Sequence, residues 1–201
     1  IFIFGHSMGG HLALRLARRM LDKGQANLRG VMLSAPMIMI PVVLRRLSLA
    51  ILNVLCRVGL AKKPVPGQQG FSRKGNGFNP RNVLTRYPEG YALQHNLFEI
   101  NPKLRSRGPT FGWVRATLAS CMATTTNPKW MAEMNLPVQA HLAGNELVTH
   151  RYASAPNLQY IEGAEVHIYD DARHELMLEL PAVRAAIWDR MAQFVDEYIS
   201  D

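Results

Sequence analysis

The sequence predicts an α/β protein with a mostly parallel sheet, and three observations support this fold class. Short apolar runs alternate along the chain with segments of helical periodicity. The first run, residues 1–4, is continuously apolar, which is typical of a strand buried on both faces of a parallel sheet. A glycine-rich turn and a helical segment follow it directly. This alternation of strand and helix indicates a parallel sheet that is covered by helices.

The other elements of the fold follow in order. Residues 8–23 are predicted to form a helix that faces inward with Leu12, Leu14 and Leu16 and ends at Gly24. Further strands are expected at residues 29–36, 136–144 and 164–170, with a helix between the last two over residues 148–161. Pro181 then begins a final helix, whose apolar residues recur at helical spacing: Val183, Ile187, Met191, Phe194, Val195 and Tyr198.

The span from Met37 to about Lys129 interrupts this alternation and is predicted to be an insertion. Residues 44–60 are amphipathic, and one face carries Leu44, Leu47, Ile51, Val54, Leu55 and Val58. The longest uncharged stretch here is well short of the ~20 residues that cross a bilayer, so we expect a cap helix. Residues 62–82 predict a long loop that is rich in Pro, Gly and basic residues. Residues 108–123 predict a second cap helix that begins near Thr110.

Charge is distributed unevenly between the insertion and the rest of the chain. The whole chain has a net charge of +8, whereas residues 37–130 contain 14 Lys or Arg and two acidic residues, a net charge of +12. This region is either a solvated basic face or a surface for an anionic partner such as a lipid headgroup or a membrane. The two cysteines form neither a disulfide framework nor a CxxC pattern, which fits a reducing compartment.

The segment Gly5-His6-Ser7-Met8-Gly9 matches the pattern G-x-S-x-G and joins a predicted strand to a predicted helix. In that context the turn is sharp, and side chains at positions 5 and 9 are expected to collide with neighbouring elements. Ser7 would then stand above the sheet edge as a nucleophile. The backbone N–H of Met8, at the helix N-terminus, would point toward the oxyanion. The alternative is a glycine-rich turn that only connects strand and helix.

A serine nucleophile needs a base and an acid that orients the base, and in hydrolases with this turn the acid precedes the histidine. His174 lies in the loop after the last predicted strand, where α/β sites gather their residues. Glu146 is the only carboxylate in the loop after the strand at 136–144, so it is the predicted acid. Asp170 and Asp171 remain alternatives, although they would have to fold back on the nearby His174.

Three segments together resemble the α/β-hydrolase branch of bacterial lysophospholipases and monoacylglycerol lipases: FGHSMGGHLALRL, HLAGNELV and ARHELMLE. Residues 84–113, with NPKL and GPTFGW, are similar to the same group, and the resemblance covers nearly all of the chain. GHSMGG alone is shared with proline iminopeptidases and esterases. ARHE together with the cap segment is more specific to the lysophospholipase and monoacylglycerol lipase group. By position, Ser7 matches the nucleophile, Glu146 the acid and His174 the base. The acid position more often holds Asp, and residue 171 is Asp where similar proteins tend to have Gly.

The resemblance implies an α/β-hydrolase fold, here the C-terminal half of a mostly parallel sheet with a helical cap inserted after the second strand. Residues 1–36 and 130–201 would form the core, and residues 37–129 the cap. The implied activity is a serine hydrolase that cleaves a carboxylic ester of a single-chain lipid, a lysophospholipid or monoacylglycerol, through an acyl-enzyme. No metal or organic cofactor is required. Phe111 and Trp113 of the cap would line an acyl tunnel.

The implied partners are a lipid ester substrate and, through the basic cap, an anionic membrane surface, but not nucleic acid. The expected location is cytoplasmic and peripheral to the inner membrane. A serine aminopeptidase similar to proline iminopeptidases is an alternative, but it would need a cap carboxylate to bind the substrate ammonium, and only Glu89 and Glu99 are present among many cations. A non-catalytic module of the same fold would predict the loss of a triad member, yet all three positions are filled.

The resemblance also implies that further strands precede the first one and bring the second oxyanion donor. We therefore expect residues 1–201 to be the C-terminal part of a longer hydrolase, in which residues 1–4 form a central strand left at an open edge. By themselves these residues are expected to be poorly stable and nearly inactive.

Overall fold

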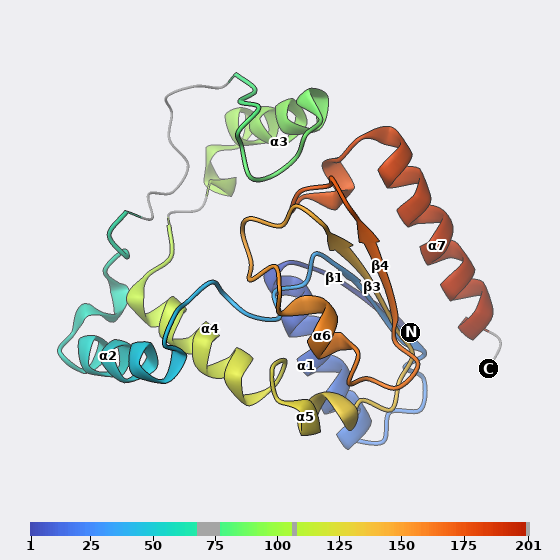
Figure 1. Cartoon of the computed structure of the whole chain (residues 1–201), viewed down its shortest axis with the longest axis horizontal. Helices are drawn as coiled ribbons and strands as arrows, with labels where there is room; N and C mark the ends of the chain where they lie inside the picture. Colours follow the sequence, from blue (N-terminus) through green and yellow to red (C-terminus); the bar gives the residue numbers. More distant parts are fainter. Residues whose placement is uncertain (68–76, 106–107, 200–201) are drawn as a thin grey trace.

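The computed structural model describes residues 1–67, 77–105 and 108–199 and confirms the predicted parallel α/β architecture. Its strands form one sheet in the order β1-β2-β3-β4, and every neighbouring pair is parallel. The strands are β1 (Phe2–His6), β2 (Gly30–Ser34), β3 (Val138–Ala143) and β4 (Glu165–Tyr169). The helices α1 (Met8–Asp22) and α6 (Ser154–Leu158) cover one face, and α7 (Pro181–Ile199) covers the other (Figure 1).

Two apolar layers hold the helices on the sheet. On one side, Ala13, Leu14 and Ala17 of α1 pack with fully buried strand residues such as Val31 and Val138. On the other side, α7 buries Ile187, Met191 and Phe194, as its helical spacing predicts. The central strands β2 and β3 are buried on both faces because they lie between these layers, whereas β1 and β4 at the two edges are only partly buried.

The predicted burial of Leu12 and Leu16 is wrong. Both side chains are 50% exposed, and together with the half-exposed Phe4 of β1 they line an open groove. β1 is the edge strand of the sheet among the described residues, and no described element covers this side of α1. Helical periodicity gives the residues that share a face, but it does not reveal whether another element packs there.

The helix predicted over residues 148–161 is reduced to the short α6. The residues before it form a loop instead, because the backbone N–H groups of Val148 and Thr149 donate to the side chain of Glu146. A polar side chain that binds its own neighbouring backbone competes with helix formation in this way. The predicted helix therefore gave way to a loop at the carboxyl end of β3.

The segment between β2 and β3 contains more helices than predicted. The two helices predicted in this segment are confirmed as α2 (Arg45–Arg57) and α4 (Phe111–Ala123), and Thr110 is the N-cap of α4, where its side chain accepts a hydrogen bond of 3.2 Å from the N–H of Trp113. The additional helices are η1 (Leu60–Lys62), α3 (Pro88–Ile100), η2 (Pro102–Leu104) and α5 (Pro128–Ala132), and η3 (Leu176–Leu178) follows β4. Residues 68–76 of the predicted loop lie outside the described residues.

These helices occupy two places around the sheet. α2 and α4 pack on each other beside the sheet, whereas α3 lies over the carboxyl ends of the strands (Figure 1). None of the described helices combines the length and the apolar character that crossing a membrane requires.

Polar contacts join α4 to α1. The Nε2 atom of His11 lies 2.8 Å from the hydroxyl of Ser120, and its Nδ1 atom lies 3.2 Å from the hydroxyl of Thr125. Thr125 donates in turn to the carbonyl of Ile38 at 2.7 Å. Burial, helped by the positive charge of Arg15, lowers the pKa of His11 to about 4. At neutral pH the imidazole is therefore uncharged and can accept a hydrogen bond from one of these hydroxyls.

A second buried histidine lies between the sheet and α7. His141 is fully buried, with its Nδ1 atom 2.9 Å from the hydroxyl of Tyr169 and its Nε2 atom 3.0 Å from the side-chain oxygen of Gln139. Burial, with the nearby His167 and Arg190, lowers the pKa of His141 from the ordinary 6.5 to about 3. Its neutral form is therefore part of the folded structure.

This histidine makes the stability of the fold depend on pH. Because the pKa of His141 is lower in the folded state, its contribution is present above pH 6.5 and is lost as the pH falls toward 3. Between pH 7.5 and 5.5 we expect this group alone to remove about 1 kcal/mol from the free energy of unfolding. Urea titrations of the His141→Gln chain should show a correspondingly smaller change. An equal pH dependence in the parent and the His141→Gln chain would contradict this prediction.

Candidate active site

Ser7 alone forms the turn between β1 and α1. Its backbone has φ 52° and ψ −121°, a region that residues other than glycine rarely occupy. Two backbone hydrogen bonds hold it there: the N–H of Ser7 donates to the carbonyl of Ser34 at 3.0 Å, and the N–H of Met37 donates to the carbonyl of Ser7 at 2.9 Å. Both partners follow or end β2, so the neighbouring strand maintains the strained turn.

The glycines around Ser7 are crowded, although not at both predicted positions. A Cβ atom on Gly5 would lie 2.5 Å from the carbonyl oxygen of Gly9 and 2.8 Å from Cβ of Ala13. The expectation that a side chain at Gly9 would collide is wrong, because a Cβ atom there meets no described atom within 4 Å. The second crowded position is Gly10, whose Cβ would lie 2.8 Å from Cβ of Pro36. Gly9 instead lies on the exposed side of α1.

The structure brings Ser7, His174 and Glu146 into one line of hydrogen bonds. The Oγ atom of Ser7 lies 2.8 Å from Nε2 of His174, and Nδ1 of His174 lies 2.8 Å from Oε2 of Glu146. A carboxylate can only accept, so Nδ1 carries the proton and Nε2 is left to accept from the serine hydroxyl. His174 and Glu146 are both at most 5% exposed. This protonation suits His174 to remove a proton from Ser7.

Glu146 is charged despite its burial. Burial by itself would raise the pKa of Glu146, but the hydrogen bond and charge of His174 and the N–H groups of Thr149 and Val148 outweigh it, so the pKa is held below its usual value. The N–H groups lie 2.7 Å (Val148) and 3.0 Å (Thr149) from Oε1. Oε2 is thereby left to His174, as an orienting acid requires.

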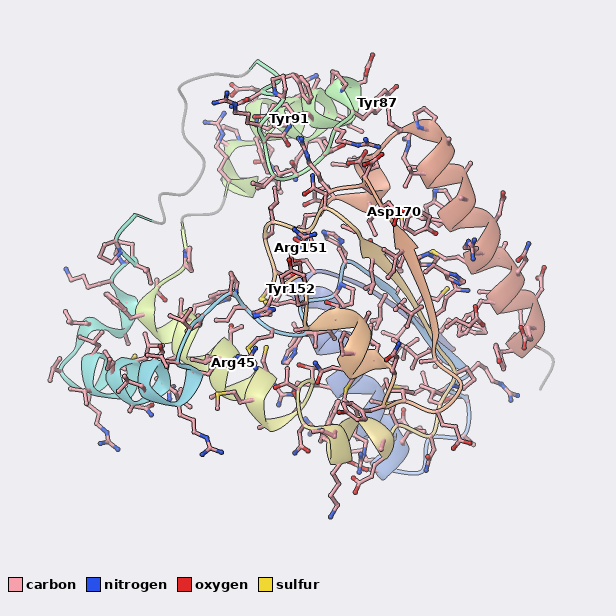
Figure 2. The ribbon with its side chains drawn as sticks, viewed as in Figure 1. Arg45, Tyr87, Tyr91, Arg151, Tyr152 and Asp170 are labelled. Atoms are coloured by element: carbon pink, nitrogen blue, oxygen red, sulfur yellow. The ribbon has the colours of Figure 1, made fainter. Side chains whose placement is uncertain are left out.

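The two alternative acids lie elsewhere. Asp170 is exposed at the end of β4 (Figure 2), and its backbone packs against Gly144. The side chain of Asp171 is 80% exposed and lies 3.3 Å from the guanidinium of Arg86. Neither carboxylate is hydrogen-bonded to His174 in the described structure, so Glu146 is the acid that the geometry favours.

A second histidine and carboxylate lie beside His174, and sequence reasoning missed them. Nε2 of His6 lies 3.3 Å from the carboxylate of Glu175, Nδ1 lies 3.2 Å from the hydroxyl of Ser34, and the rings of His6 and His174 are 5.1 Å apart. Burial would raise the pKa of Glu175, but the hydrogen bond and charge of His6, the charge of His174 and a hydrogen bond from Gln94 together hold it below its usual value. Two carboxylates therefore flank the base. The position of Glu175 directly after His174 was the available signal.

The loop that carries His174 is fixed by residues 82–90. Glu179 is fully buried and accepts hydrogen bonds from the backbone N–H groups of Arg86 at 2.9 Å and Arg173 at 3.0 Å. The N–H of Glu175 donates to the carbonyl of Leu84 at 2.8 Å. Gly90 of α3 packs so closely on the carbonyl of Leu178 that no side chain fits between them. The segment between β2 and β3 thus contributes directly to the position of His174.

The remaining predicted site residues divide into two groups. Met8 is the first residue of α1, so its backbone N–H is at the helix N-terminus beside Ser7, as expected. Phe111 and Trp113 are in the first turn of α4, which packs on η1 at the end of α4 that lies away from the sheet (Figure 1). The structure does not bring these two side chains to Ser7. Within the described residues, no group of three or more His, Cys, Asp or Glu side chains could hold a metal ion.

Known proteins are similar to this chain in family and in fold. The family model described as "Serine aminopeptidase, S33" matches residues 1–181. A search of curated proteins found no match. Among solved structures, the chain is similar to a monoacylglycerol lipase from Paleococcus ferrophilus (19% identity, TM-score 0.67, 97% of this chain and 68% of that chain).

Two further solved structures are similar over almost the whole chain. One is a soluble variant of the monoglyceride lipase from Saccharomyces cerevisiae with a substrate analogue (17% identity, TM-score 0.68, 98% of this chain and 61% of that chain). The other is a carboxyl esterase from Bacillus coagulans with glycerol (17% identity, TM-score 0.69, 98% and 64%). The chain spans 61% to 68% of the length of these three proteins. At these identities the likeness concerns the fold.

The crowding at Gly5 can be tested against the open position Gly9. Gly5→Ala should lower the free energy of unfolding by roughly 1–3 kcal/mol, because its Cβ must displace the backbone of Gly9 and the side chain of Ala13. Gly9→Ala should leave it unchanged or raise it by up to about 1 kcal/mol, since alanine favours a helix. Urea denaturation measures both values. Equal effects of the two substitutions would contradict the described turn.

The choice of acid can be tested by the rate at which a fluorophosphonate labels Ser7. In Glu146→Gln the neutral amide cannot stabilise the imidazolium of His174, so labelling should slow by roughly a hundredfold or more. Asp171→Asn removes an exposed carboxylate that is paired with Arg86, and it should change the rate less than about twofold. A larger effect of Asp171→Asn than of Glu146→Gln would assign the acid to the loop after β4 instead.

Proposed function

The chain belongs to the serine aminopeptidase S33 family of α/β-hydrolases, and from this premise we propose that it is a serine hydrolase of carboxylic esters. The observation that supports the proposal most is the hydrogen-bonded line of Ser7, His174 and Glu146, in which both distances are 2.8 Å. Acyl transfer through a serine requires a nucleophile, a base with an unprotonated nitrogen, and a buried, charged acid.

The proposed reaction follows from these positions. His174 takes the proton of Ser7 at Nε2 while Oγ attacks the ester carbonyl, and the N–H of Met8 donates to the oxyanion. Glu146 stabilises the imidazolium through Nδ1. The imidazolium then gives its proton to the leaving alcohol, and an acyl-enzyme remains on Ser7. Water activated by His174 releases the carboxylic acid. These steps use only side chains and backbone, so the reaction needs no metal or organic cofactor.

For the substrate we propose an ester of a single-chain lipid, a lysophospholipid or a monoacylglycerol. The similar structures include a monoacylglycerol lipase and a monoglyceride lipase by name, which supports a monoacyl ester. In this proposal residues 1–36 and 130–201 form the hydrolase core, and residues 37–129 form a cap over it. Phe111 and Trp113 would line an acyl tunnel only after a change in the position of α4, because its first turn packs on η1.

An aminopeptidase activity, which the family description names, is less well supported by the charges of the cap. Such an enzyme needs a free carboxylate to bind the ammonium group of its substrate. Glu99 lies 2.6 Å from the guanidinium of Arg105, so its charge is already compensated. Glu89 is in the first turn of α3, where the helix dipole favours a negative charge. The excess of cations in the same segment repels an ammonium group and favours an anionic or neutral substrate.

The basic cap also supports peripheral contact with an anionic membrane. Residues 37–130 carry a net charge of +12, which attracts the negative surface of a bilayer. A lipid hydrolase that binds at such a surface would meet its substrate there at high local concentration.

A fluorophosphonate probe and two substrates test the proposal. The probe should label Ser7, the Ser7→Ala chain should remain unlabelled, and a monoacylglycerol or lysophospholipid should compete for labelling. An amino-acid naphthylamide should not compete, and competition by it alone would favour the aminopeptidase. Absence of labelling in a folded protein that includes the expected upstream strands would overturn the enzyme proposal. Slow turnover of residues 1–201 by themselves stays a prediction, which a turnover number typical of lipases would contradict.

A further inference from the structure

A set of exposed apolar side chains lies on and directly beside α2. The helix buries only Leu52, whereas the side chains on its opposite face are 51% to 81% exposed: Val43, Leu44, Leu47, Ile51, Val54 and Val58. Val43 and Leu44 precede the helix, and the residues from Leu47 to Val58 are spaced by three or four positions, so they form one stripe along it. We call it the α2 stripe. It includes most of the face that the sequence pattern identified as apolar, and the structure turns this face to solvent. Continuous apolar surfaces of this kind mark interaction sites.

The charged residues of the segment that carries the α2 stripe are all positive. Residues 23–88 contain no Asp or Glu. Arg46 and Arg57 are exposed near the two ends of α2, and Lys62 and Lys63 are exposed directly after it. An apolar helix face with basic flanks is the pattern by which amphipathic helices lie in the interface of anionic bilayers.

A hollow of about 660 Å³ adjoins the start of the stripe. It lies between α2 and the end of α4 and is lined by Leu44, Arg45, Arg46, Leu47, Met122 and Thr126. Figure 2 shows Arg45 at the end of α2 that adjoins α4. In the described part of the chain, neither Arg45 nor Arg46 forms an ion pair. Two guanidinium groups beside leucines match a lipid headgroup phosphate beside its acyl chains.

The start of α2 is unfavourable without an anion. Arg45 and Arg46 are in the first turn, where the helix dipole repels cations, and no acidic residue is in that turn. Leu44, which precedes the helix, has φ 47° and ψ 50°, a left-handed conformation that costs free energy for leucine, and it provides no side-chain cap. A phosphate bound in the hollow would offset the repulsion and supply the missing negative charge.

We infer that the α2 stripe and the Arg45–Arg46 hollow form a docking surface for an anionic phospholipid bilayer, in which the stripe enters the interface and the hollow binds a lipid phosphate. Nucleic acid is a poorer fit, since residues 43–63 contain no aromatic side chain for base stacking. A second copy of the chain is also a poorer fit. Two stripes in contact would bring Arg46 and Arg57 near their copies, with no acid in residues 23–88 to compensate.

This inference deepens the membrane contact of the proposed function, but the binding does not require hydrolysis. The two can therefore fail separately. Vesicle binding is best measured with the Ser7→Ala chain, so that no lipid is consumed, and the parent chain is expected to bind equally well.

Sedimentation with vesicles tests the docking surface. The chain should bind vesicles of phosphatidylcholine with about one third phosphatidylglycerol far better than phosphatidylcholine alone, and high salt should weaken binding. Arg45→Gln with Arg46→Gln should lower the affinity roughly tenfold or more. Ile51→Ser with Val54→Ser should lower it at least as much, while circular dichroism and the melting temperature of each variant show that it is folded.

Two controls test whether binding depends on this surface or only on the total charge and the total exposed apolar area of the chain. Arg19→Gln with Lys23→Gln removes the same charge from α1, and Ile100→Ser removes an exposed apolar side chain from α3; both should leave binding within about twofold of the parent. Equal losses in the control and α2 variants would overturn the proposal. So would equal binding to neutral vesicles, or a stripe-dependent dimer or nucleic-acid complex that forms in place of vesicle binding.

Discussion

The candidate site depends on the hydrogen bond between Nδ1 of His174 and the buried carboxylate of Glu146. This bond fixes which nitrogen of the imidazole carries the proton, and therefore which one faces Ser7. A buried carboxylate is stable only if its charge is compensated, and the N–H groups of Val148 and Thr149 provide part of that compensation. The loop after β3 has its shape because those two N–H groups turn toward Glu146 and cannot take part in a helix.

Hydrogen bonds also fix the loop that carries the base, but they come from a different part of the chain than those around the acid. Residues 82–90 belong to the segment between β2 and β3, yet they bind the loop around His174 through Glu179, Leu84 and Gly90. Glu179 is fully buried and bonds backbone N–H groups on both sides of this contact, so its loss would leave them unpaired. The segment between β2 and β3 therefore contacts the loop that carries the base, so a movement of α3 would change the position of His174.

The local features could be predicted from the sequence, and the long-range ones could not. The strands, the turn at Ser7, and α2, α4 and α7 follow from patterns within a few residues, and the order of nucleophile, acid and base restricted the choice to His174 and a few carboxylates. Periodicity identified apolar faces but not their surroundings, so Leu12 and Leu16 were expected to be buried. The contacts of Glu179 and of His6 join residues far apart in sequence, and the pairing of His6 with Glu175 appears only once the sheet is formed.

The first turn of α1 connects the candidate site to α4. The N-terminus of α1 carries Ser7 and Met8, and one turn later His11 binds Ser120 of α4. Because burial lowers the pKa of His11 to about 4, this contact involves the neutral ring at neutral pH and persists without a counter-ion. Asn53 of α2 accepts from Arg115 of α4 at 3.4 Å, and Leu52 is buried in the same core. The direction in which α2 presents its exposed apolar face is therefore set by contacts that begin one turn from the nucleophile.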